Sequence, residues 1–444
     1  MLYETHIAQK DRLKLYFGMT ASTLRMQAGL MRAFNAASFA RPYDASAEIA
    51  ERIVKDYPKQ PFGLDSTTVR EEIICDRPFG SLLHFKRDTT RNDPKILLVA
   101  PMSGHYATLL RDMVKDLLPH HDVYITDWKN ARDVPLRDGN FSLEDYVTYV
   151  KDFIEAIGPD THVVGISQST VPLLAATALL AADRSKAQPA SMTLMCGPVD
   201  TRLSPTAINA YAKKNPLSWF KDNVIARVPS QFSGEGRLVY PGFMQLAGLK
   251  ASDPGRHAQA QIDLFRHICN GNDKEAEKIR AYYDEYDAVM DSADQFYLDT
   301  IYHVFQNHTL AKGEMTWRGQ KVNPAAIRKT ALLTVEGQKD TICGNGQTLA
   351  AHALCGNLKN SQRYAYSQPD AGHYDILNPA RIAGFIRTVA EQNGISYDTM
   401  PETAMIRPQR QSLETARTTL TLLRDGANDN TKTRPVFPRR PAIA

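Results

Sequence analysis

His162-Val163-Val164-Gly165-Ile166-Ser167-Gln168-Ser169-Thr170 is a short β-branched run that ends at a serine and leads into a long apolar helical pattern. It approximates Gly-x-Ser-x-Gly, in which a sharp strand-to-helix turn lifts a serine hydroxyl above a sheet. The helix N-terminus and the next backbone N–H can then stabilise a developing oxyanion. The pattern predicts Ser167 as an attacking group, although Ser169 stands where a glycine is usual. The alternative is an ordinary buried strand, turn and helix with a serine N-cap.

The bulk composition predicts a soluble globular protein. Of the 444 residues, 43% are hydrophobic and 23% are charged, and no apolar run is long enough to cross a bilayer. The five cysteines lack Cys-x-x-Cys spacing, which fits neither a disulfide framework nor a zinc site, so we expect a reducing cytoplasm. Charged residues interrupt the apolar ones near the N-terminus, and we therefore expect no standard export signal.

Strand and helix patterns alternate over much of the chain. Strands are expected at residues 81–85, 95–100, 122–126, 161–166, 191–195, 330–336 and 362–367. Buried runs of this kind, separated by helix-length segments, indicate a mostly parallel sheet with helices on both faces. Active sites in such sheets lie at the carboxyl ends of the strands.

The same alternation divides the chain into segments. We expect an N-terminal helical segment at 1–65, a first core part at 66–197, a helical cap insertion at 198–328, a second core part at 329–400 and a disordered basic tail at 401–444. Within the first segment, Pro42, Pro58 and Pro61 are expected to break the helical pattern. The tail lacks the interleaved aromatics of nucleic-acid binders and the net charge is only +4, so no nucleic-acid partner is expected.

Two later loops supply the base and the acid that a serine nucleophile requires. Asp340 and His373 each lie just beyond a predicted strand. The chain order of serine, aspartate and histidine is that of an α/β-hydrolase triad, so we expect this fold with Ser167 as nucleophile, His373 as base and Asp340 as acid. The alternatives are an Asx-turn at Asp340 and a structural loop histidine, and Asp370 is a rival acid.

An oxyanion loop is expected at Pro101-Met102-Ser103-Gly104-His105, directly after an apolar strand. The backbone N–H groups of Met102 or Ser103, with that of Gln168, are the expected oxyanion donors. The alternative is a helix N-cap at Ser103, with His105 lining the pocket. The sequence has no Walker loop, no Gly-x-Gly-x-x-Gly after a strand and no His-Glu-x-x-His, so we expect neither a cofactor nor a metal.

Several longer strings of residues are informative together. They are APMSGH at 100–105, HDVYITDW at 121–128, NARDVP at 130–135, YDEY at 283–286, MLYE at 1–4, YPGF at 240–243, TVEG at 334–337 and GHY at 372–374. These strings resemble the intracellular polyhydroxyalkanoate depolymerases. The resemblance covers nearly everything before residue 400. It implies a cytoplasmic α/β-hydrolase that acts on stored polyesters of 3-hydroxy acids, chiefly polyhydroxybutyrate in granules.

One position departs from that family. Many of its members have cysteine as the nucleophile, followed by Gln-Pro, whereas this chain has Ser167-Gln168-Ser169. Thiol-dependent behaviour is therefore not expected here, and a polyester synthase, which would need a cysteine nucleophile, is disfavoured. A serine can cleave an ester by the same route as a cysteine nucleophile, through an acyl-enzyme.

The sequence thus predicts a polyester depolymerase that uses a Ser-His-Asp triad and associates with the granule surface. Two alternatives stay open: an esterase for small acyl esters, and a granule-surface binding protein without catalysis. The expected partner is the polyester granule. No transmembrane segment is expected in the chain, and the oligomeric state stays open.

Overall fold

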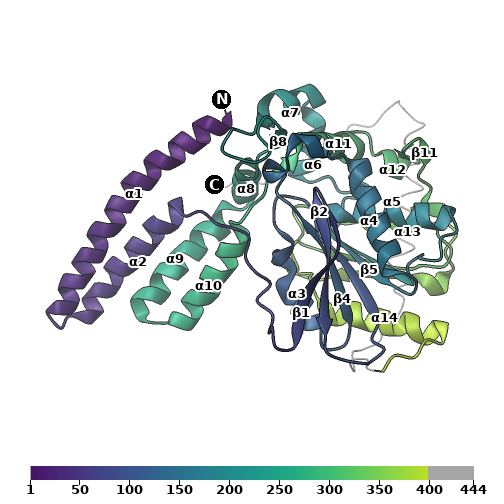
Figure 1. Cartoon of the computed structure of the whole chain (residues 1–444), viewed down its shortest axis with the longest axis horizontal. Coiled ribbons are helices and arrows are strands. Elements are labelled where there is room, and N and C mark those ends of the chain that lie inside the picture. The colour runs from purple at the N-terminus through teal and green to yellow at the C-terminus, as the bar shows by residue number, and fades with distance from the viewer. Residues whose placement is uncertain (1, 399–444) are drawn as a thin grey trace, which may run out of the picture.

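The computed structural model describes residues 2–398, and its centre is one eight-stranded sheet (Figure 1). The strand order is β1-β2-β4-β3-β5-β6-β12-β13, with parallel pairing from β4 to β13 and antiparallel pairing of β2 with both its neighbours. The strands are β1 Val69–Arg77, β2 Gly80–Arg87, β3 Lys95–Val99, β4 Asp122–Trp128, β5 His162–Ile166, β6 Ser191–Met195, β12 Ala331–Gly337 and β13 Arg363–Gln368. All seven expected strands are confirmed.

Strand β1 was not expected from the sequence. Most of its side chains are exposed or half-buried, because it lies at the edge of the sheet and pairs only with β2. It therefore lacks the continuous apolar run of strands that are buried on both faces. The central strands β5 and β6 are buried at every position.

Helices flank the sheet as two packed pairs, α3 with α14 and α4 with α5. Helix α5 is buried along almost its whole length, which explains its unbroken apolar sequence. The helical elements of this core are η1 Ala107–Leu110, α3 Arg111–Leu117, η2 Ala131–Asp133, η3 Leu136–Asp138, α4 Leu143–Ile157, η4 Ser167–Ser169, α5 Thr170–Ala182, α13 Ala351–Leu354, η7 Asn360–Gln362 and α14 Pro379–Asn393. Sheet order, parallel pairing and flanking helices make this an α/β-hydrolase fold.

The turn between β5 and α5 accommodates Ser169 in place of the usual glycine. The Ser169 side chain is fully buried, and its Oγ accepts the backbone N–H of Ile166 at 2.7 Å. The same Oγ lies 2.6 Å from the carbonyl oxygen of Val99 on the neighbouring strand. The hydroxyl thus joins the turn to β3. The turn is closely packed at Gly165, where a Cβ would lie 2.8 Å from the Leu173 side chain and 3.3 Å from the Cα of Thr170.

The segment between β6 and β12 contains helices and short strands. They are α6 Ala207–Lys214, α7 Leu217–Val224, β7 Ala226–Arg227, β8 Leu238–Tyr240, α8 Gly242–Ser252, α9 Pro254–Asn270, α10 Asp273–Tyr286, β9 Ser292–Ala293, α11 Asp294–Asp299, the π-helix η5 Thr300–Gln306, α12 Thr309–Lys312, β10 Thr316–Trp317, β11 Gln320–Lys321 and η6 Pro324–Ala326. Its residues 289–292 bond to the loop that follows β3: Met290 N–H donates to the Gly104 carbonyl, and Ser292 Oγ donates to the Met102 carbonyl. This segment therefore covers the carboxyl edge of the sheet.

An arm of helices projects from one side of the molecule (Figure 1). It consists of α1 Leu2–Ala33 and α2 Ala37–Val54, with α9 packed against α2 and α10 against α9. The Arg280 guanidinium contacts both carboxylate oxygens of Glu48 at 2.7 and 2.8 Å, which fixes α10 to α2. The expected break at Pro42 is wrong, because Pro42 lies inside α2. Packing on α1 and α9 outweighs the roughly 3 kcal/mol that an interior proline costs.

Two further observations complete the fold. Among the helices of residues 2–398, none combines the length and the apolar character needed to cross a bilayer. The basic tail expected at 401–444 lies outside the described residues.

The Ser169 contacts predict a measurable loss of stability. In Ser169→Ala the buried N–H of Ile166 loses its acceptor, so the free energy of unfolding should fall by about 1–3 kcal/mol. Denaturant unfolding measures this change. The control is Ser66→Ala, an exposed serine, which should stay within about 0.5 kcal/mol of the wild type. Equal stability of Ser169→Ala and wild type would contradict the role given to this hydroxyl.

Candidate active site

The structure brings Ser167, His373 and Asp340 into one hydrogen-bonded line. His373 Nε2 lies 3.0 Å from Ser167 Oγ, and His373 Nδ1 lies 2.7 Å from Asp340 Oδ2. The side chains of His373 and Asp340 are 10% and 1% exposed. Ser167 has a φ of +55°, a left-handed conformation that a non-glycine residue adopts only where its surroundings impose it. This strained turn at the end of β5 presents the hydroxyl to the imidazole.

Close backbone contacts bring the Asp340 loop and the His373 loop together. The N–H of Lys339 donates to the carbonyl of Ala371 at 2.9 Å. At the end of β12, a Cβ on Gly337 would lie 2.5 Å from that same carbonyl oxygen. Only glycine lets the two loops approach this closely, so the residue before the acid loop is part of the site geometry.

The second carboxylate oxygen of Asp340 is held by its own loop. Oδ1 accepts the backbone N–H groups of Ile342 and Cys343 at 2.8 and 2.9 Å. Three bonds thus fix the carboxylate with Oδ2 facing the imidazole. The rival acid Asp370 lies elsewhere: its side chain is exposed and pairs with Lys339 at 2.8 Å.

Glu336 supports the acid loop from beneath, a role that the sequence did not reveal. Its buried carboxylate accepts the backbone N–H groups of Gly346, Thr348 and Leu349 at 2.8–2.9 Å. Burial raises the pKa of Glu336, and these hydrogen bonds oppose that rise. The sequence signal for this role was a glutamate near the end of the strand that precedes Asp340.

The expected oxyanion loop is anchored by two buried side chains. Trp128 Nε1 and Tyr146 OH donate to the carbonyl oxygen of Ala100 at 2.8 and 2.7 Å, which fixes the end of β3. Within residues 2–398, the backbone N–H groups of Met102 and Ser103 make no hydrogen bond. They therefore stay available as donors. The backbone of Gln168 directly follows Ser167 at the start of the helical turn.

Two side chains of this loop do not act as first expected. Ser103 caps no helix, because the next helical turn begins at Ala107 with Tyr106 at its N-cap. His105 is buried, and its Nε2 lies 3.0 Å from the carbonyl oxygen of Tyr286. Burial lowers the pKa of His105 to about 4, so the ring is a neutral structural group.

Aromatic side chains join the segment between β6 and β12 to the loops that carry His105 and His373. The ring of Tyr286 on α10 lies 5.0 Å from that of His105 and 6.2 Å from that of Tyr374, which follows His373. Tyr282 stacks on Tyr286 at 5.7 Å. Sequence spacing could not select these tyrosines from the many aromatics of the segment.

Cys196 lies beside the imidazole and was not expected at the site. It follows β6, is 1% exposed and has a φ of +41°. Burial lowers the pKa of His373, but contact with Cys196 and the hydrogen bond to Asp340 outweigh that effect and raise the pKa above its ordinary value. These groups stabilise the imidazolium that forms when the ring accepts a proton.

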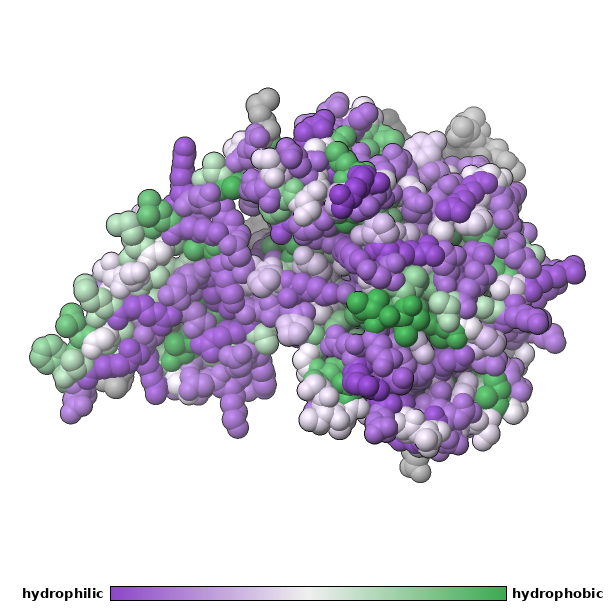
Figure 2. Space-filling view, viewed as in Figure 1, coloured by the Kyte–Doolittle hydropathy of each residue, from purple (hydrophilic) through white to green (hydrophobic). Residues whose placement is uncertain are grey.

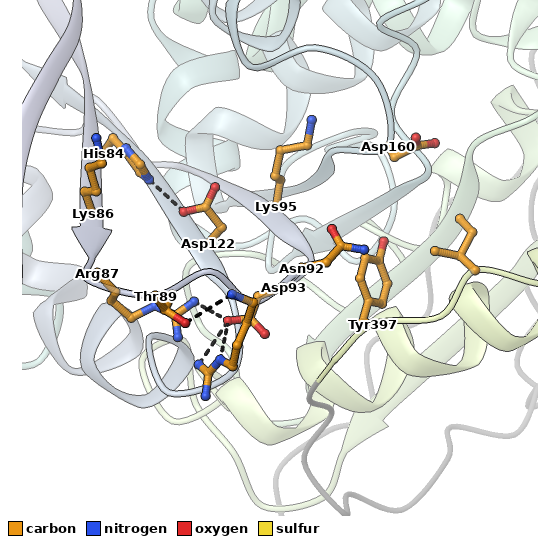
Figure 3. Close-up of a pocket in the computed structure, with 12 residues that line it drawn as sticks. His84, Lys86, Arg87, Thr89, Asn92, Asp93, Lys95, Asp122, Asp160 and Tyr397 are labelled. Carbon is orange, nitrogen blue, oxygen red and sulfur yellow. Dashed lines mark hydrogen bonds and ion pairs between the residues drawn. The ribbon is translucent and has the colours of Figure 1, made fainter.

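A solvent cavity lies at the opposite edge of the sheet (Figure 3). It has a volume of about 460 Å³ and is lined by Lys95 and Asp122, the first residues of β3 and β4, and by His84, whose Nε2 lies 2.7 Å from Asp122 Oδ1. Ser167, His373 and Asp340 do not line this cavity. Because Ser167 follows the carboxyl end of β5, this cavity is separate from the candidate active site.

Solved structures show similarity at low sequence identity. A monoacylglycerol lipase of Paleococcus ferrophilus is 14% identical, with a TM-score of 0.39, covering 68% of this chain and 95% of its own. A thioesterase domain from the curacin biosynthetic pathway is 10% identical, with a TM-score of 0.39. The match covers 72% of this chain and 99% of that domain. 2-Hydroxy-6-oxo-6-phenylhexa-2,4-dienoate hydrolase from Rhodococcus sp. strain RHA1 is 16% identical, with a TM-score of 0.34. The match covers 69% of this chain and 93% of that hydrolase.

The family comparison is more specific. The comparison with curated protein sequences found no match. Residues 196–392, which contain two of the three hydrogen-bonded residues, match the family described as PHB de-polymerase C-terminus. The expected family resemblance is thereby confirmed over this range.

Proposed function

We propose that this protein hydrolyses the ester bonds of polyhydroxyalkanoate, chiefly polyhydroxybutyrate, through an acyl-enzyme on Ser167. The observation that carries the proposal is the line from Ser167 Oγ through the His373 imidazole to the Asp340 carboxylate, with hydrogen bonds of 3.0 and 2.7 Å. A serine hydroxyl becomes nucleophilic only when a base removes its proton, and this line supplies base and acid in order. The family match supplies the polyester class.

In the proposed mechanism His373 Nε2 takes the Ser167 proton as Oγ attacks an ester carbonyl carbon. The N–H groups of Met102, Ser103 and Gln168 bind the oxyanion of the tetrahedral intermediate. The intermediate collapses, and His373 returns the proton to the departing hydroxyl of the shortened polymer. Water then attacks the acyl-enzyme with His373 again as base, which releases a 3-hydroxy acid and restores the serine.

The exposed surface of the helical arm favours a substrate with a large apolar surface over a small soluble ester. One side of α1 packs on α2 through Phe17, Ala21 and Leu24. Large apolar side chains nevertheless stay exposed along the arm, namely Leu15, Tyr16, Met19, Met26, Leu30, Phe34 and Phe39. Figure 2 shows hydrophobic residues over the outer part of the arm. Exposed apolar surface of this extent is typical of docking sites, so granule association in the cytoplasm forms part of the proposal.

The Ser167 variant tests the nucleophile. Ser167→Ala should lower hydrolysis of amorphous polyhydroxybutyrate granules by about 10⁴- to 10⁶-fold, because the members of a triad act as a unit. Release of 3-hydroxy acid measures the rate, and co-sedimentation measures granule binding, which the variant should retain. A folded Ser167→Ala protein with wild-type rates would refute the mechanism. Wild-type co-sedimentation without product release would favour a binding protein, and cleavage confined to short-chain esters would favour a small-ester esterase.

The two neighbouring aspartates provide a matched test of the acid. Asp340→Asn should lower the rate by about 10⁴-fold, because an amide neither holds the productive imidazole tautomer nor stabilises the imidazolium. Asp370→Asn removes an exposed carboxylate of the loop after β13, which pairs with Lys339, so its rate should stay near that of the wild type. The initial rates of both variants on one polyester preparation decide the assignment, and the reverse order of effects would contradict it.

A further inference from the structure

Cys196, His373 and Asp340 form a group of potential metal ligands. A nitrogen of His373, a carboxylate oxygen of Asp340 and Cys196 Sγ all lie within 4.8 Å of one another. The three residues come from separate places: the end of β6, the loop after β13 and the loop after β12. The proposed hydrolytic mechanism involves the His373 imidazole and the Asp340 carboxylate, whereas the buried thiol of Cys196 takes no part in it.

The group approaches the geometry of a three-ligand zinc site. Zinc bonds to sulfur, nitrogen and oxygen of about 2.0–2.3 Å place tetrahedral ligands about 3.3–3.7 Å apart. The Nδ1-to-Oδ2 separation is 2.7 Å, so it needs to widen by less than about 1 Å, while the sulfur needs to move inward. Thiolate and imidazole ligands select zinc over magnesium or calcium. His373 is the member of the group that solvent reaches most readily.

We propose that Cys196, His373 and Asp340 bind a Zn²⁺ ion that reversibly switches the enzyme off. The thiol of Cys196 loses its proton to water on binding, and His373 coordinates through Nδ1. The single proton of the neutral imidazole then lies on Nε2, where it faces Ser167. An Nε2 that carries a proton cannot accept the serine proton, so attack on the ester stops. Removal of the ion restores the Nδ1–H bond to Asp340.

Zinc binding is tested independently of hydrolysis. Metal-free protein is titrated with Zn²⁺ against a chromophoric chelator of known affinity. The wild type should bind one ion more tightly than Cys196→Ala, whose affinity at this site should fall by more than about a hundredfold, because losing a direct ligand costs more than losing an outer-shell partner. With Co²⁺ as the probe, the wild type should show a thiolate-to-cobalt charge-transfer band that Cys196→Ala lacks. Cys196→Ser, which keeps the side-chain size, should lack the band as well and serves if the alanine variant folds poorly.

Three variants serve as controls. Cys355→Ala removes another buried thiol and Cys75→Ala a half-buried one, and both should keep the wild-type zinc affinity. Ser167→Ala removes the proposed nucleophile but none of the three ligands, so it should also bind the ion. The inhibition rests on the proposed function, whereas the zinc titration of Ser167→Ala does not, so a failure of one is distinguishable from a failure of the other.

Inhibition is measured on ester hydrolysis, with each variant compared with its own metal-free rate. The Zn²⁺ concentration that halves the rate should rise by more than about a hundredfold in Cys196→Ala, and a chelator should restore the wild-type rate. Equal zinc affinity of wild type and both Cys196 variants, or a cobalt spectrum without the thiolate band, would overturn the proposed site. Equal inhibition of wild type and Cys196→Ala would overturn the switch.

Discussion

Parallel pairing of β5, β6, β12 and β13 is the constraint on which the rest of the site depends. Because these four strands run in the same direction, the loops that follow them leave the sheet at the same edge. Ser167, Cys196, Asp340 and His373 each follow one of these strands. Residues that are remote in sequence therefore meet within hydrogen-bond distance. The glycine at 337 permits the close backbone approach that completes the arrangement.

Much of this architecture could be predicted from the sequence because it leaves local patterns. Apolar strands, the Gly165-to-Ser169 turn and the order of serine, aspartate and histidine are all visible along one chain. The hydrogen bonds among Ser167, His373 and Asp340 agree with that expectation, while their catalytic roles stay a proposal. The oxyanion donors are backbone groups, so their residue types carry almost no information, and only their place after β3 pointed to them.

Other features depend on tertiary contacts that no local pattern records. Edge strand β1 has too few buried positions to look like a strand of this sheet. Pro42 continues a helix because neighbouring helices hold it in place. Cys196 is one of five cysteines without a motif, and it gains chemical meaning only because β6 lies between β5 and β12. Glu336 and Tyr286 likewise depend on what packs against them.

The imidazole of His373 has two potential nucleophiles as neighbours. The Ser167 hydroxyl faces Nε2, whereas the Cys196 sulfur lies 3.8 Å from the His373 carbonyl oxygen. Only the serine sits on the strained turn at a helix N-terminus, next to free backbone N–H groups that can stabilise an oxyanion. This geometry favours the hydroxyl as the proposed nucleophile and leaves the thiol for the proposed zinc site. A phosphonate ester with a good leaving group, followed by peptide mass spectrometry, tests this division most directly. The account predicts a single covalent adduct on Ser167, and an adduct on Cys196 instead would contradict it.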